Sequence, residues 1–582
     1  MTHTTLSPLS DALKGERPED IFPQGLDSTR RHIAEFRQVS PCEVAVGLNG
    51  KFTLYCLLLS LAHTNTQKTQ PIVYFPSHLS GIEDMLRLVG FIAIPFDSAQ
   101  DVESLLTEPD RIVAVIFSRP LQHILASQKS RSLVLRNPLS FIFIESSLTS
   151  NRNSWPAKTL VFQYLFENEH FFFLGQMTRA KEELGYLIAT KRSIDRFSII
   201  HRTLAVGASI SSQKISASFF ALPRASIFFS KQPIFENASS ETRGQPLGLP
   251  WVREKVATFV KTSMANLMLT RGSCMALTSA MQGLRLLELV KKTNGNHATR
   301  EHILCPLPHF PGYPGSIGLA GFKPVYYEVG SAALIPGLKR LVTTNNPVAI
   351  LLNFPHNPTG RILSEHEWRQ ILQLAEYQKM HLLLDETFVG LEYTNHGQAC
   401  FSIDHPLLIR CGGFSKRFPS LSDVRLGYLI APPAFLHLAS EIHQTMSGEP
   451  AATSQKSVGR FLQLTNPTQQ VQLFGEELRR HRDLALKRLT ACSFFIRVHC
   501  PQSGYFICVQ LPDEIDCAAF SQALRKATGL WCANALSFGV NSENWIRFRF
   551  AESYENLVRN IDRLIQFCEN SGAYASSFTK LP

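Results

Sequence analysis

Two apolar runs, each ending in a polar residue and separated by a helical pattern, constrain the fold of this chain more than any other feature. The runs are VAILLNF (348–354) and HLLLDE (381–386), and unbroken apolar character is typical of strands buried in a parallel sheet. Between them, residues 364–379 open with the capping box Ser364–Glu367. An approximately helical apolar stripe follows, made of Trp368, Ile371, Leu372, Ala375 and Tyr377. Strand, helix and strand in this order predict a right-handed crossover in an α/β domain.

The chain also resembles itself. Residues 185–214, beginning GYLIATKRS, match residues 427–456, beginning GYLIAPPAF, with a constant offset (443 − 201 = 242 and 455 − 213 = 242). PQGLDSTRRHIAEF (23–36) likewise parallels PLGLPWVREKVATF (246–259), with an offset of 246 − 23 = 223. Self-similarity in a fixed order is the signature of an internal duplication. Residues ~20–220 are therefore predicted to be a second copy of a large domain that occurs again downstream.

Three polar motifs follow one another in the C-terminal copy and carry the strongest chemical signal. They are NFPHNPTG (353–360), LLLDETF (382–388) and GGFSKRFPSLSDVRLGY (412–428). In order, they supply Asn357, Asp385, Lys416 and Arg425. Asn357 and Asp385 lie just beyond the ends of the two predicted strands, which is where ligands of open α/β sheets bind.

These side chains suit a carbonyl cofactor that carries a pyridine ring and a phosphate. A lysine amine forms a Schiff base with a carbonyl, and a carboxylate keeps a pyridine nitrogen protonated so that the ring accepts electrons. An amide at the ring oxygen tunes the cofactor, and a guanidinium binds a phosphate with its planar fork. The pattern predicts a pyridoxal 5′-phosphate (PLP) site.

At these residues the chain resembles the class I and II aminotransferases, which are fold type I PLP enzymes. Four flanking motifs extend the resemblance over roughly residues 225–570: LTRGSCMAL (269–277), PLPHFPGY (306–313), PQSGYF (501–506) and IRFRFA (546–551). The resemblance implies catalytic roles for Lys416 and Asp385 and a substrate-carboxylate role for Arg547. The cofactor-binding residues that it implies are Asn357, Arg425, Ser415, Gly272, Ser273, Cys274, Phe310 and Phe388.

The resemblance also implies an architecture. The expected fold class is α/β, with two large domains of the PLP-transferase type, each with a mainly parallel sheet, in tandem. The expected boundaries are 1–220 for a degenerate large domain, 221–470 for the PLP-binding large domain and 471–582 for a small α+β domain. Because relatives pair through their large domains, the two copies are expected to form a pseudo-dimer within the chain, with a further homodimer left open. An inert duplicated scaffold is the alternative.

The activity implied is transfer of an amino group between an amino acid and a 2-oxo acid. Two alternatives stay open, because one set of residues supports several outcomes. One is a different PLP reaction, such as a lyase-type elimination or a cyclisation. The other is a protein with weakened catalysis that serves regulation or assembly.

Several departures from the family pattern bear on these expectations. Phe388 stands where the family has a tyrosine whose hydroxyl bonds the cofactor's ring oxygen, so tuning of the cofactor should be weaker. In the N-terminal copy, the lysine position is assigned to Leu174, the phosphate arginine to Glu183 and the aspartate to Glu145. That copy is expected to be catalytically inactive.

Each candidate residue also has a structural interpretation that needs no cofactor. Lys416 and Arg425 could be surface cations, and Asp385 could cap a helix. Asn357 could begin a turn, and Phe310 could be core packing alone. The order of the motifs favours the site over these alternatives.

Composition narrows the remaining classes. The net charge is +11, but the basic residues are dispersed, and the densest run, LRRHRDLALKR (478–488), lies on a predicted amphipathic helix around 468–489. We expect a solvated helix face there and no nucleic-acid partner. The twelve cysteines show no metal-ligand spacing, so no metal is expected. No apolar run approaches the ~20 residues that span a bilayer, so no membrane partner and a cytoplasmic location are expected.

Overall fold

The chain forms two compact units in a computed structural model. The structure describes residues 27–37, 39–47, 49–64, 71–77, 79, 81–97, 112–117, 139–144, 171–179, 182–204, 245–293, 300–330, 334–393, 404–540 and 543–570. One unit comprises residues 1–243 with 444–453, and the other comprises residues 244–443 with 454–582. The expected boundary at 220 lies outside the described residues.

The C-terminal unit is built around a seven-stranded sheet with the strand order β10-β9-β11-β12-β13-β14-β8. Its strands are β8 (Leu267–Thr270), β9 (His302–Leu307), β10 (Lys323–Glu328), β11 (Ala349–Asn353), β12 (His381–Asp385), β13 (Leu408–Gly413) and β14 (Gly427–Ile430). Only β14 runs antiparallel to its neighbours. The helices that go with this sheet are α11 (Pro250–Val260), α12 (Ser273–Thr293), α13 (Tyr313–Leu319), α14 (Leu334–Asn345), α15 (Glu365–Gln378), α16 (Pro433–Ser447) and α17 (Ala452–Leu464). The predicted α/β fold is confirmed.

The strand–helix–strand unit predicted at 348–386 is present as β11, α15 and β12. The two strands are parallel neighbours, and Asn353 pairs with Asp385 at their carboxyl ends. Helix α15 begins with the predicted capping box between Ser364 and Glu367. The predicted stripe is wrong at Tyr377, which is 83% exposed. It lies nine residues after Trp368, which at ~100° per residue places it on the opposite face of the helix.

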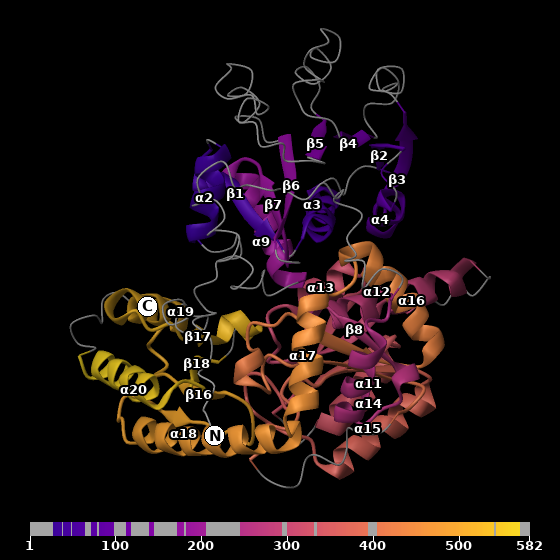
Figure 1. Ribbon diagram of the computed structural model, residues 1–582. Helices are drawn as coiled ribbons and strands as arrows, with labels where there is room; N and C mark the ends of the chain where they lie inside the picture. Colours follow the sequence, from indigo (N-terminus) through magenta and orange to yellow (C-terminus); the bar gives the residue numbers. More distant parts are fainter. Residues whose placement is uncertain are drawn as a thin grey trace. The chain divides into compact units, whose positions relative to one another are not determined.

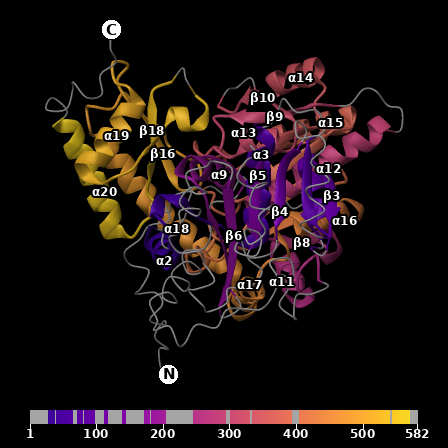
Figure 2. The same ribbon diagram turned by 90° about the horizontal axis from the view of Figure 1, so that it is seen from above.

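A second, four-stranded sheet belongs to the same unit, with the order β15-β16-β18-β17. Its elements are α18 (Pro467–Thr490), β15 (Arg497–Val498), β16 (Phe506–Gln510), α19 (Cys517–Thr528), β17 (Ala533–Asn534), β18 (Trp545–Arg549) and α20 (Tyr554–Glu569). Figure 1 and Figure 2 both show these elements gathered at one side of the seven-stranded sheet. They lie within the range expected for a small domain, except that α18 begins at Pro467, and the division of this unit at 471 stays a prediction.

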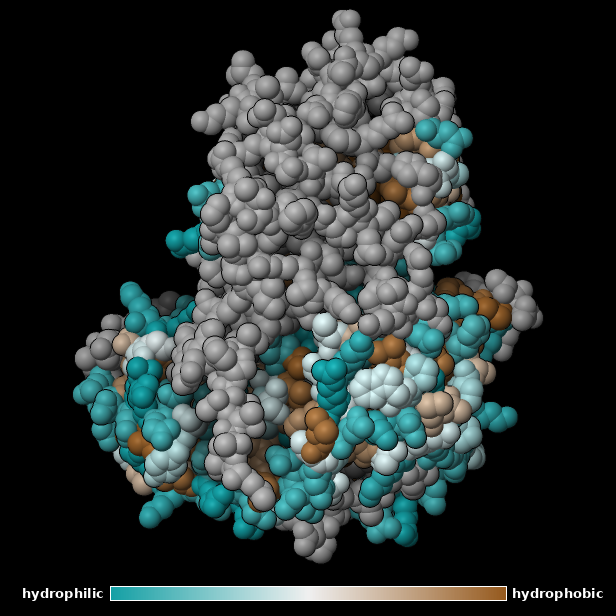
Figure 3. All heavy atoms as spheres, viewed as in Figure 1, coloured by the Kyte–Doolittle hydropathy of each residue, from teal (hydrophilic) through white to brown (hydrophobic). Residues whose placement is uncertain are grey.

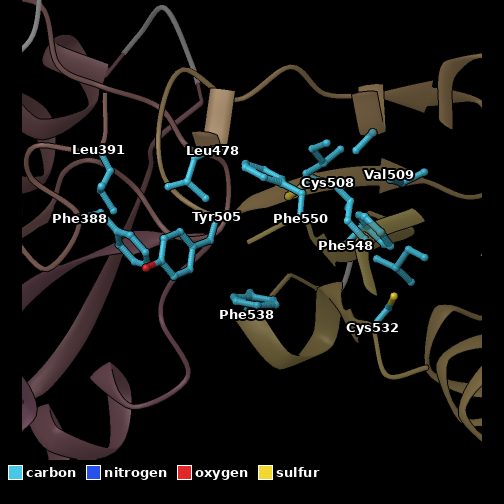
Figure 4. Packing of buried hydrophobic residues seen from close by; sticks show 14 of the residues in the cluster. Phe388, Leu391, Leu478, Tyr505, Cys508, Val509, Cys532, Phe538, Phe548 and Phe550 are labelled. Atoms are coloured by element: carbon cyan, nitrogen blue, oxygen red, sulfur yellow. The ribbon is translucent and has the colours of Figure 1, made fainter. Parts of the chain in front are cut away.

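The core is continuous between the two sheets of the C-terminal unit. Phe388 and Leu391, from the loop after β12, belong to the same buried cluster as Leu478 of α18 and Phe548 of β18. Figure 4 shows the ring of Phe388 facing Tyr505 where these parts meet. Burial of each such side chain contributes about 1.5–3 kcal/mol, so the relative position of the two sheets is held by packing.

The basic run at 478–488 lies on α18, as predicted. Leu478 and Ala485 face the core, while Arg479, Arg480 and Lys487 are exposed. Figure 3 shows hydrophilic and hydrophobic residues interspersed on the visible face of the C-terminal unit. Within the described ranges, no helix combines the length and the apolar character needed to cross a membrane.

The N-terminal unit has its own seven-stranded sheet with the order β1-β7-β6-β5-β4-β2-β3. Its described elements are α2 (Asp27–Arg37), β1 (Val44–Gly47), α3 (Gly50–Thr64), β2 (Ile72–Pro76), α4 (Ile82–Val89), β3 (Ile92–Phe96), β4 (Ile112–Phe117), β5 (Ser140–Ile144), β6 (Phe171–Arg179), β7 (Glu182–Ile188) and α9 (Lys191–Leu204). Read from β3, the order is that of the C-terminal sheet read from β10. Strand β7, like β14, runs antiparallel to both neighbours.

The pairing of β1 with β7 and of β8 with β14 repeats the offsets found in the sequence. Val44 of β1 pairs with Ile188 of β7, and Leu267 of β8 pairs with Ile430 of β14. The differences are 267 − 44 = 223 and 430 − 188 = 242. This agreement supports the duplication predicted from the sequence.

The same register corrects the assignment of Leu174. Gln176 pairs with Gly185 as Gly413 pairs with Gly427, so Leu174 corresponds to Cys411, and its assignment to the lysine position is wrong. Eight residues (185 − 176 − 1) join the paired positions in the N-terminal unit, against thirteen (427 − 413 − 1) in the other. The constant offset of 242 therefore ends at β7.

The N-terminal segment that matches the lysine turn is partly described. Strands β6 and β7 continue their ladder to Arg179 and Glu182, while Lys181 lies outside the described residues. Glu145 lies outside them as well, and Glu183 lies on β7 with its offset of 242 from Arg425 unchanged.

Candidate active site

Lys416 lies in a turn between β13 and β14. The turn is closed by bonds from the backbone N–H groups of Arg417 and Phe418 to the carbonyl oxygen of Phe414, both 3.1 Å long. The carbonyl oxygen of Lys416 itself accepts a hydrogen bond from the hydroxyl of Tyr505. The main chain at Lys416 is thus fixed by a residue from the segment that leads into β16.

Asp385 is the last residue of β12 and lies within a hydrogen-bonded cradle. Its carboxylate accepts bonds from the Tyr313 hydroxyl at 2.6 Å and from both the hydroxyl and the backbone N–H of Thr387, at 2.6 and 3.0 Å. Burial nevertheless raises the pKa of Asp385 above its usual range, because these bonds only partly offset desolvation. A cationic partner at this carboxylate would stabilise its charged form.

Asn357 and Arg547 meet although 190 positions separate them. Arg547, on β18, donates from Nη1 to the side-chain oxygen of Asn357 at 2.9 Å. Its guanidinium carbon lies 3.8 Å from the ring centroid of Phe506 and 4.8 Å from that of Phe538. The turn carrying Asn357 is organised by Asn353, whose side-chain oxygen accepts from the Asn357 N–H at 3.0 Å.

Gly272, Ser273 and Cys274 lie at the beginning of α12. Gly272 has φ 93°, a conformation that favours glycine, and Ser273 is the first residue of the helix. A Cβ on Gly427 would lie 2.6 Å from the backbone nitrogen of Ser273, so β14 approaches this turn as closely as glycine allows. The N–H groups at a helix N-terminus favour an anion.

The thiol of Cys274 shows that the predicted residues converge. Its pKa is raised to about 11, mainly by burial and further by the carboxylate of Asp385, while the cations of Arg425 and Lys416 oppose the rise. These effects require the groups to be near neighbours. The structure therefore brings Cys274, Asp385, Lys416 and Arg425 together at the carboxyl ends of the strands.

Arg425 lies just before β14. Burial lowers the pKa of its guanidinium, against an opposing effect of Asp423. Its Nε atom is buried and has no hydrogen-bond partner in the described part of the chain. Ser415, beside Lys416, is half-buried. A buried guanidinium with an unbonded nitrogen is suited to an anionic group.

The two predicted aromatic residues lie in different surroundings. Phe310 is half-buried, with its ring centroid 5.4 Å from that of Tyr313. Phe388 is 6% exposed and packs edge-on against Tyr505, 5.4 Å between centroids. The described contacts of Phe388 are those of a core residue, and its predicted role as a cofactor contact stays a prediction.

Arg549, two residues beyond Arg547, takes no part in this arrangement. Its Nε lies 3.5 Å from Glu552 and donates to the carbonyl oxygen of Ala551, so its described contacts are those of a salt-bridge residue. Among the described residues, no group of three or more histidine, cysteine or acidic side chains could hold a metal ion.

Sequence reasoning missed several residues of the site. Tyr313 bonds Asp385, Tyr505 bonds Lys416, and Asn353 holds the Asn357 turn. Tyr313 and Asn353 lie inside motifs that the sequence already singles out. Their polar side chains next to buried strands were the available signal.

Fold and site together define a fold type I PLP enzyme. Residues 230–564 match the model of the family described as aminotransferase class I and II, which is more than half of the 582-residue chain. The chain belongs to this family, whose members are aminotransferases that use PLP.

Two relatives show which kinds of aminotransferase the chain is similar to. The chain is 26% identical over 349 residues to a probable N-acetyl-LL-diaminopimelate aminotransferase of Bacillus subtilis, covering 58% of this chain and 84% of the relative. It is 27% identical over 272 residues to aromatic-amino-acid aminotransferase 2 of Thermococcus litoralis, covering 45% and 69%. The crystal structure of an aromatic aminotransferase from Pyrococcus horikoshii shares the fold, with a TM-score of 0.50, 23% identity and coverage of 56% and 87%.

The residues present fit PLP. The buried, unbonded Nε of Arg425 and the helix N-terminus at Ser273 suit its phosphate. The carboxylate of Asp385, with its raised pKa, suits its pyridinium nitrogen. Lys416 would supply the amine that forms a Schiff base with the carbonyl of PLP.

Proposed function

We propose that the chain transfers an amino group between an α-amino acid and a 2-oxo acid, with Lys416 as the catalytic base. The observation that carries the proposal is geometric: Asp385 ends β12, Lys416 follows the neighbouring strand β13, and β14 lies against the beginning of α12 at the same edge of the sheet. The order of the motifs along the sequence and the chain's membership of the family support the same function.

PLP, when bound, supplies an electron sink that makes the Cα proton of an amino acid acidic. Asp385 would hold the pyridinium nitrogen, and the raised pKa of this carboxyl would fall again on gaining a cationic partner. Arg425 and the N–H groups around Ser273 would hold the phosphate. Asn357 and Phe310 would contact the ring.

Arg547 binds the α-carboxylate of the substrate. Its bond to Asn357 and its contacts with Phe506 and Phe538 fix the plane of the guanidinium before the substrate arrives. A pre-oriented fork binds a carboxylate with two parallel hydrogen bonds and loses little side-chain entropy.

Lys416 moves the proton. Its main chain is held by Tyr505, so the side chain starts from a fixed point in the turn that follows β13. From there Nζ removes the proton from Cα of the bound amino acid. A positioned base of this kind contributes about 10²–10⁴-fold to the rate.

The relatives act, by their names, on an N-acetylated diaminopimelate, on aromatic amino acids and on aspartate. These side chains differ in charge and size. A donor screen should therefore include acidic, aromatic and basic α-amino acids, each with its 2-oxo acid.

The test compares purified wild-type protein with Lys416→Ala after addition of PLP. Wild type should show the visible absorption of lysine-bound cofactor, and borohydride should fix the cofactor on the peptide containing Lys416. Addition of an amino acid should convert the cofactor to its amine form, and a 2-oxo acid should convert it back. Lys416→Ala should lose all three signals.

Lys323→Ala is the matched control, because Lys323 is an exposed lysine paired with Glu301. It should behave as wild type. Release of a 2-oxo acid together with ammonia, without the amine form, would indicate a lyase instead. Bound cofactor that responds to no amino acid would support a regulatory protein, and no visible band in wild type would exclude PLP chemistry.

A further inference from the structure

A buried polar cluster lies directly behind Asp385 and Lys416, and its members are Glu386, Arg410, Arg417 and Tyr428. Each is at most 4% exposed, so none can touch a substrate. Glu386 follows Asp385 in the chain, and Arg417 follows Lys416. The cluster therefore joins the next-door neighbours of the two residues that the proposed function makes catalytic.

Glu386 is the centre of the cluster. Its carboxylate accepts from Nε of Arg410 at 3.0 Å and from the hydroxyl of Tyr428 at 2.5 Å. Its backbone N–H also donates to the carbonyl oxygen of Cys411 at 2.9 Å, which continues the β12–β13 ladder past Asp385. Alternation along this extended segment directs Asp385 and Glu386 to opposite faces.

Arg417 ties the lysine turn to this centre. Its Nη2 donates to the hydroxyl of Tyr428 at 2.6 Å and to the backbone carbonyl oxygen of Glu386 at 3.0 Å. The same guanidinium lies 5.7 Å from the ring centroids of Phe259 and Tyr428. The Tyr428 hydroxyl thus bridges the cation that follows Lys416 and the anion that follows Asp385.

Glu386 is the carboxylate that the two arginines of the cluster share: Nε of Arg410 lies 3.0 Å from it and Nη2 of Arg417 lies 3.9 Å from it. Nη1 of Arg410 lies 4.0 Å from Asp404, an exposed carboxylate outside the cluster. Nη1 of Arg410 and Nε of Arg417 are buried and have no hydrogen-bond partner in the described part of the chain. A buried charge that loses its partner is strongly destabilised, so loss of any bond to Glu386 should disturb the arrangement.

Room for the bridging hydroxyl is provided by Gly412. A Cβ at this position would lie 2.3 Å from the hydroxyl oxygen of Tyr428. Any larger residue on this part of β13 would displace the bridge. The glycine and the tyrosine are paired across the β13–β14 ladder.

We infer that the Glu386–Tyr428–Arg417 bridge is a positioning device that sets where the Lys416 turn lies relative to Asp385. This inference rests on the proposed function. The bridge acts through the backbone on either side of the reacting groups. Its loss should alter the placement of the cofactor and the rate at saturating substrate more than it alters substrate affinity.

Tyr428→Phe removes the bridging oxygen and keeps the ring. We expect kcat to fall about tenfold with KM changed less than about twofold, which is the signature of an interaction used after binding. The visible circular dichroism of lysine-bound cofactor, which reports its orientation in the site, should weaken in parallel. Gly412→Ala, which displaces the same hydroxyl, should reproduce both changes.

Tyr327→Phe is the matched control. Tyr327 is 3% exposed and its hydroxyl donates to the carbonyl oxygen of Leu351 at 2.8 Å, so it is a buried tyrosine of the same sheet with a backbone partner. It should lower the unfolding temperature while leaving kcat and the dichroism unchanged. Arg417→Lys keeps a cation and should lie between wild type and Arg417→Met in both readouts.

The outcomes separate the two ideas. A wild-type protein with no visible band and no trapped cofactor overturns the proposed function and the inference with it. A wild type that binds PLP, together with Tyr428→Phe and Arg417→Met variants that match Tyr327→Phe in kcat and dichroism, overturns the inference alone. Should Tyr428→Phe fail to fold, the graded comparison of Arg417→Lys with Arg417→Met decides in the same way.

Discussion

The charged carboxylate of Asp385 lowers the stability of the cofactor-free protein. Its carboxylate is desolvated, and three hydrogen bonds do not restore its usual pKa. A carboxyl whose pKa is raised by folding contributes most to stability when it is protonated in both states. That contribution is lost as the pH rises through the raised value.

Asp385→Asn should therefore stabilise the cofactor-free protein while abolishing amino transfer. At pH 8 we expect a gain of about 0.5–2 kcal/mol, the range of stabilising substitutions at strained functional sites. The gain should shrink as the pH falls and the wild-type carboxyl becomes protonated. Thermal unfolding of both cofactor-free proteins at several pH values would measure it.

Asp404→Asn is the contrasting variant, because Asp404 accepts from the hydroxyl of Thr262 at 2.9 Å and lies beside Arg410. It should not stabilise. An Asp385→Asn protein that is no more stable than wild type at pH 8 would show that the hydrogen bonds outweigh desolvation.

Arg547 gives a prediction about substrate binding. Arg547→Met should lower kcat/KM for an amino acid by at least about 100-fold, because truncating one partner of a charged pair costs about 2–5 kcal/mol. The loss should be much smaller for an amine that lacks the α-carboxylate. Arg549→Met, which removes the pair with Glu552 and the bond to Ala551, is the control and should stay within a few-fold of wild type. Equal losses for the acid and the amine would argue against carboxylate binding by Arg547.

Sequence reasoning identified the residues of the site better than their partners. Asp385 and Lys416 are recognisable because each lies in a local motif. The hydrogen bonds that hold them join Tyr313 to Asp385 across 72 positions and Tyr505 to Lys416 across 89. No local pattern encodes such pairs, since they depend on how strands and turns stack in space.

Among the elements, α15 shows how a short signal fixes a boundary. The hydroxyl of Ser364 accepts from the N–H of Glu367 at 3.2 Å, and the Glu367 carboxylate accepts from the N–H of Ser364 at 2.9 Å. This reciprocal pattern sets the helix start at Glu365, as predicted. The predicted apolar stripe was wrong at one position, because Leu374 packs against the core whereas Tyr377 is exposed.

Ser364→Ala should loosen the first turn of α15. The loss of an N-cap costs about 1 kcal/mol, and the Glu367 carboxylate also loses the bond that it accepts from the Ser364 hydroxyl. Hydrogen–deuterium exchange of the peptide covering residues 361–379 should quicken accordingly. Glu365→Gln, which removes an exposed pair with Arg369, should change exchange by less than about 0.5 kcal/mol. Equal effects of the two variants would mean that the capping box contributes no more than an exposed charge.

At the scale of the whole molecule, the two sheets share strand order, the position of the antiparallel strand and the register of β1 with β7. The sequence offsets predicted this correspondence, because they run without gaps through the edge strands. They failed at Leu174, since an offset measured on one side of a length change does not hold on the other. Only the ladder between β6 and β7 reveals where the change falls.

We predict one cofactor per chain from this comparison. Borohydride trapping followed by peptide mapping should label Lys416 and no residue before 244. Lys181 is the informative residue, because it lies in the shortened segment that matches the lysine turn. A Lys181→Ala protein should keep one full equivalent of PLP, and label on Lys181 in wild type would contradict an inactive N-terminal unit.

The short connection between β6 and β7 limits which mutations could give the N-terminal unit a turn like the one that carries Lys416. A point mutation exchanges one side chain, whereas the path that carries Lys416 needs five more residues than the N-terminal unit has (13 − 8 = 5). We predict that a substitution to lysine in this shorter connection will not by itself give the N-terminal unit amine chemistry, because the connection would also have to be lengthened.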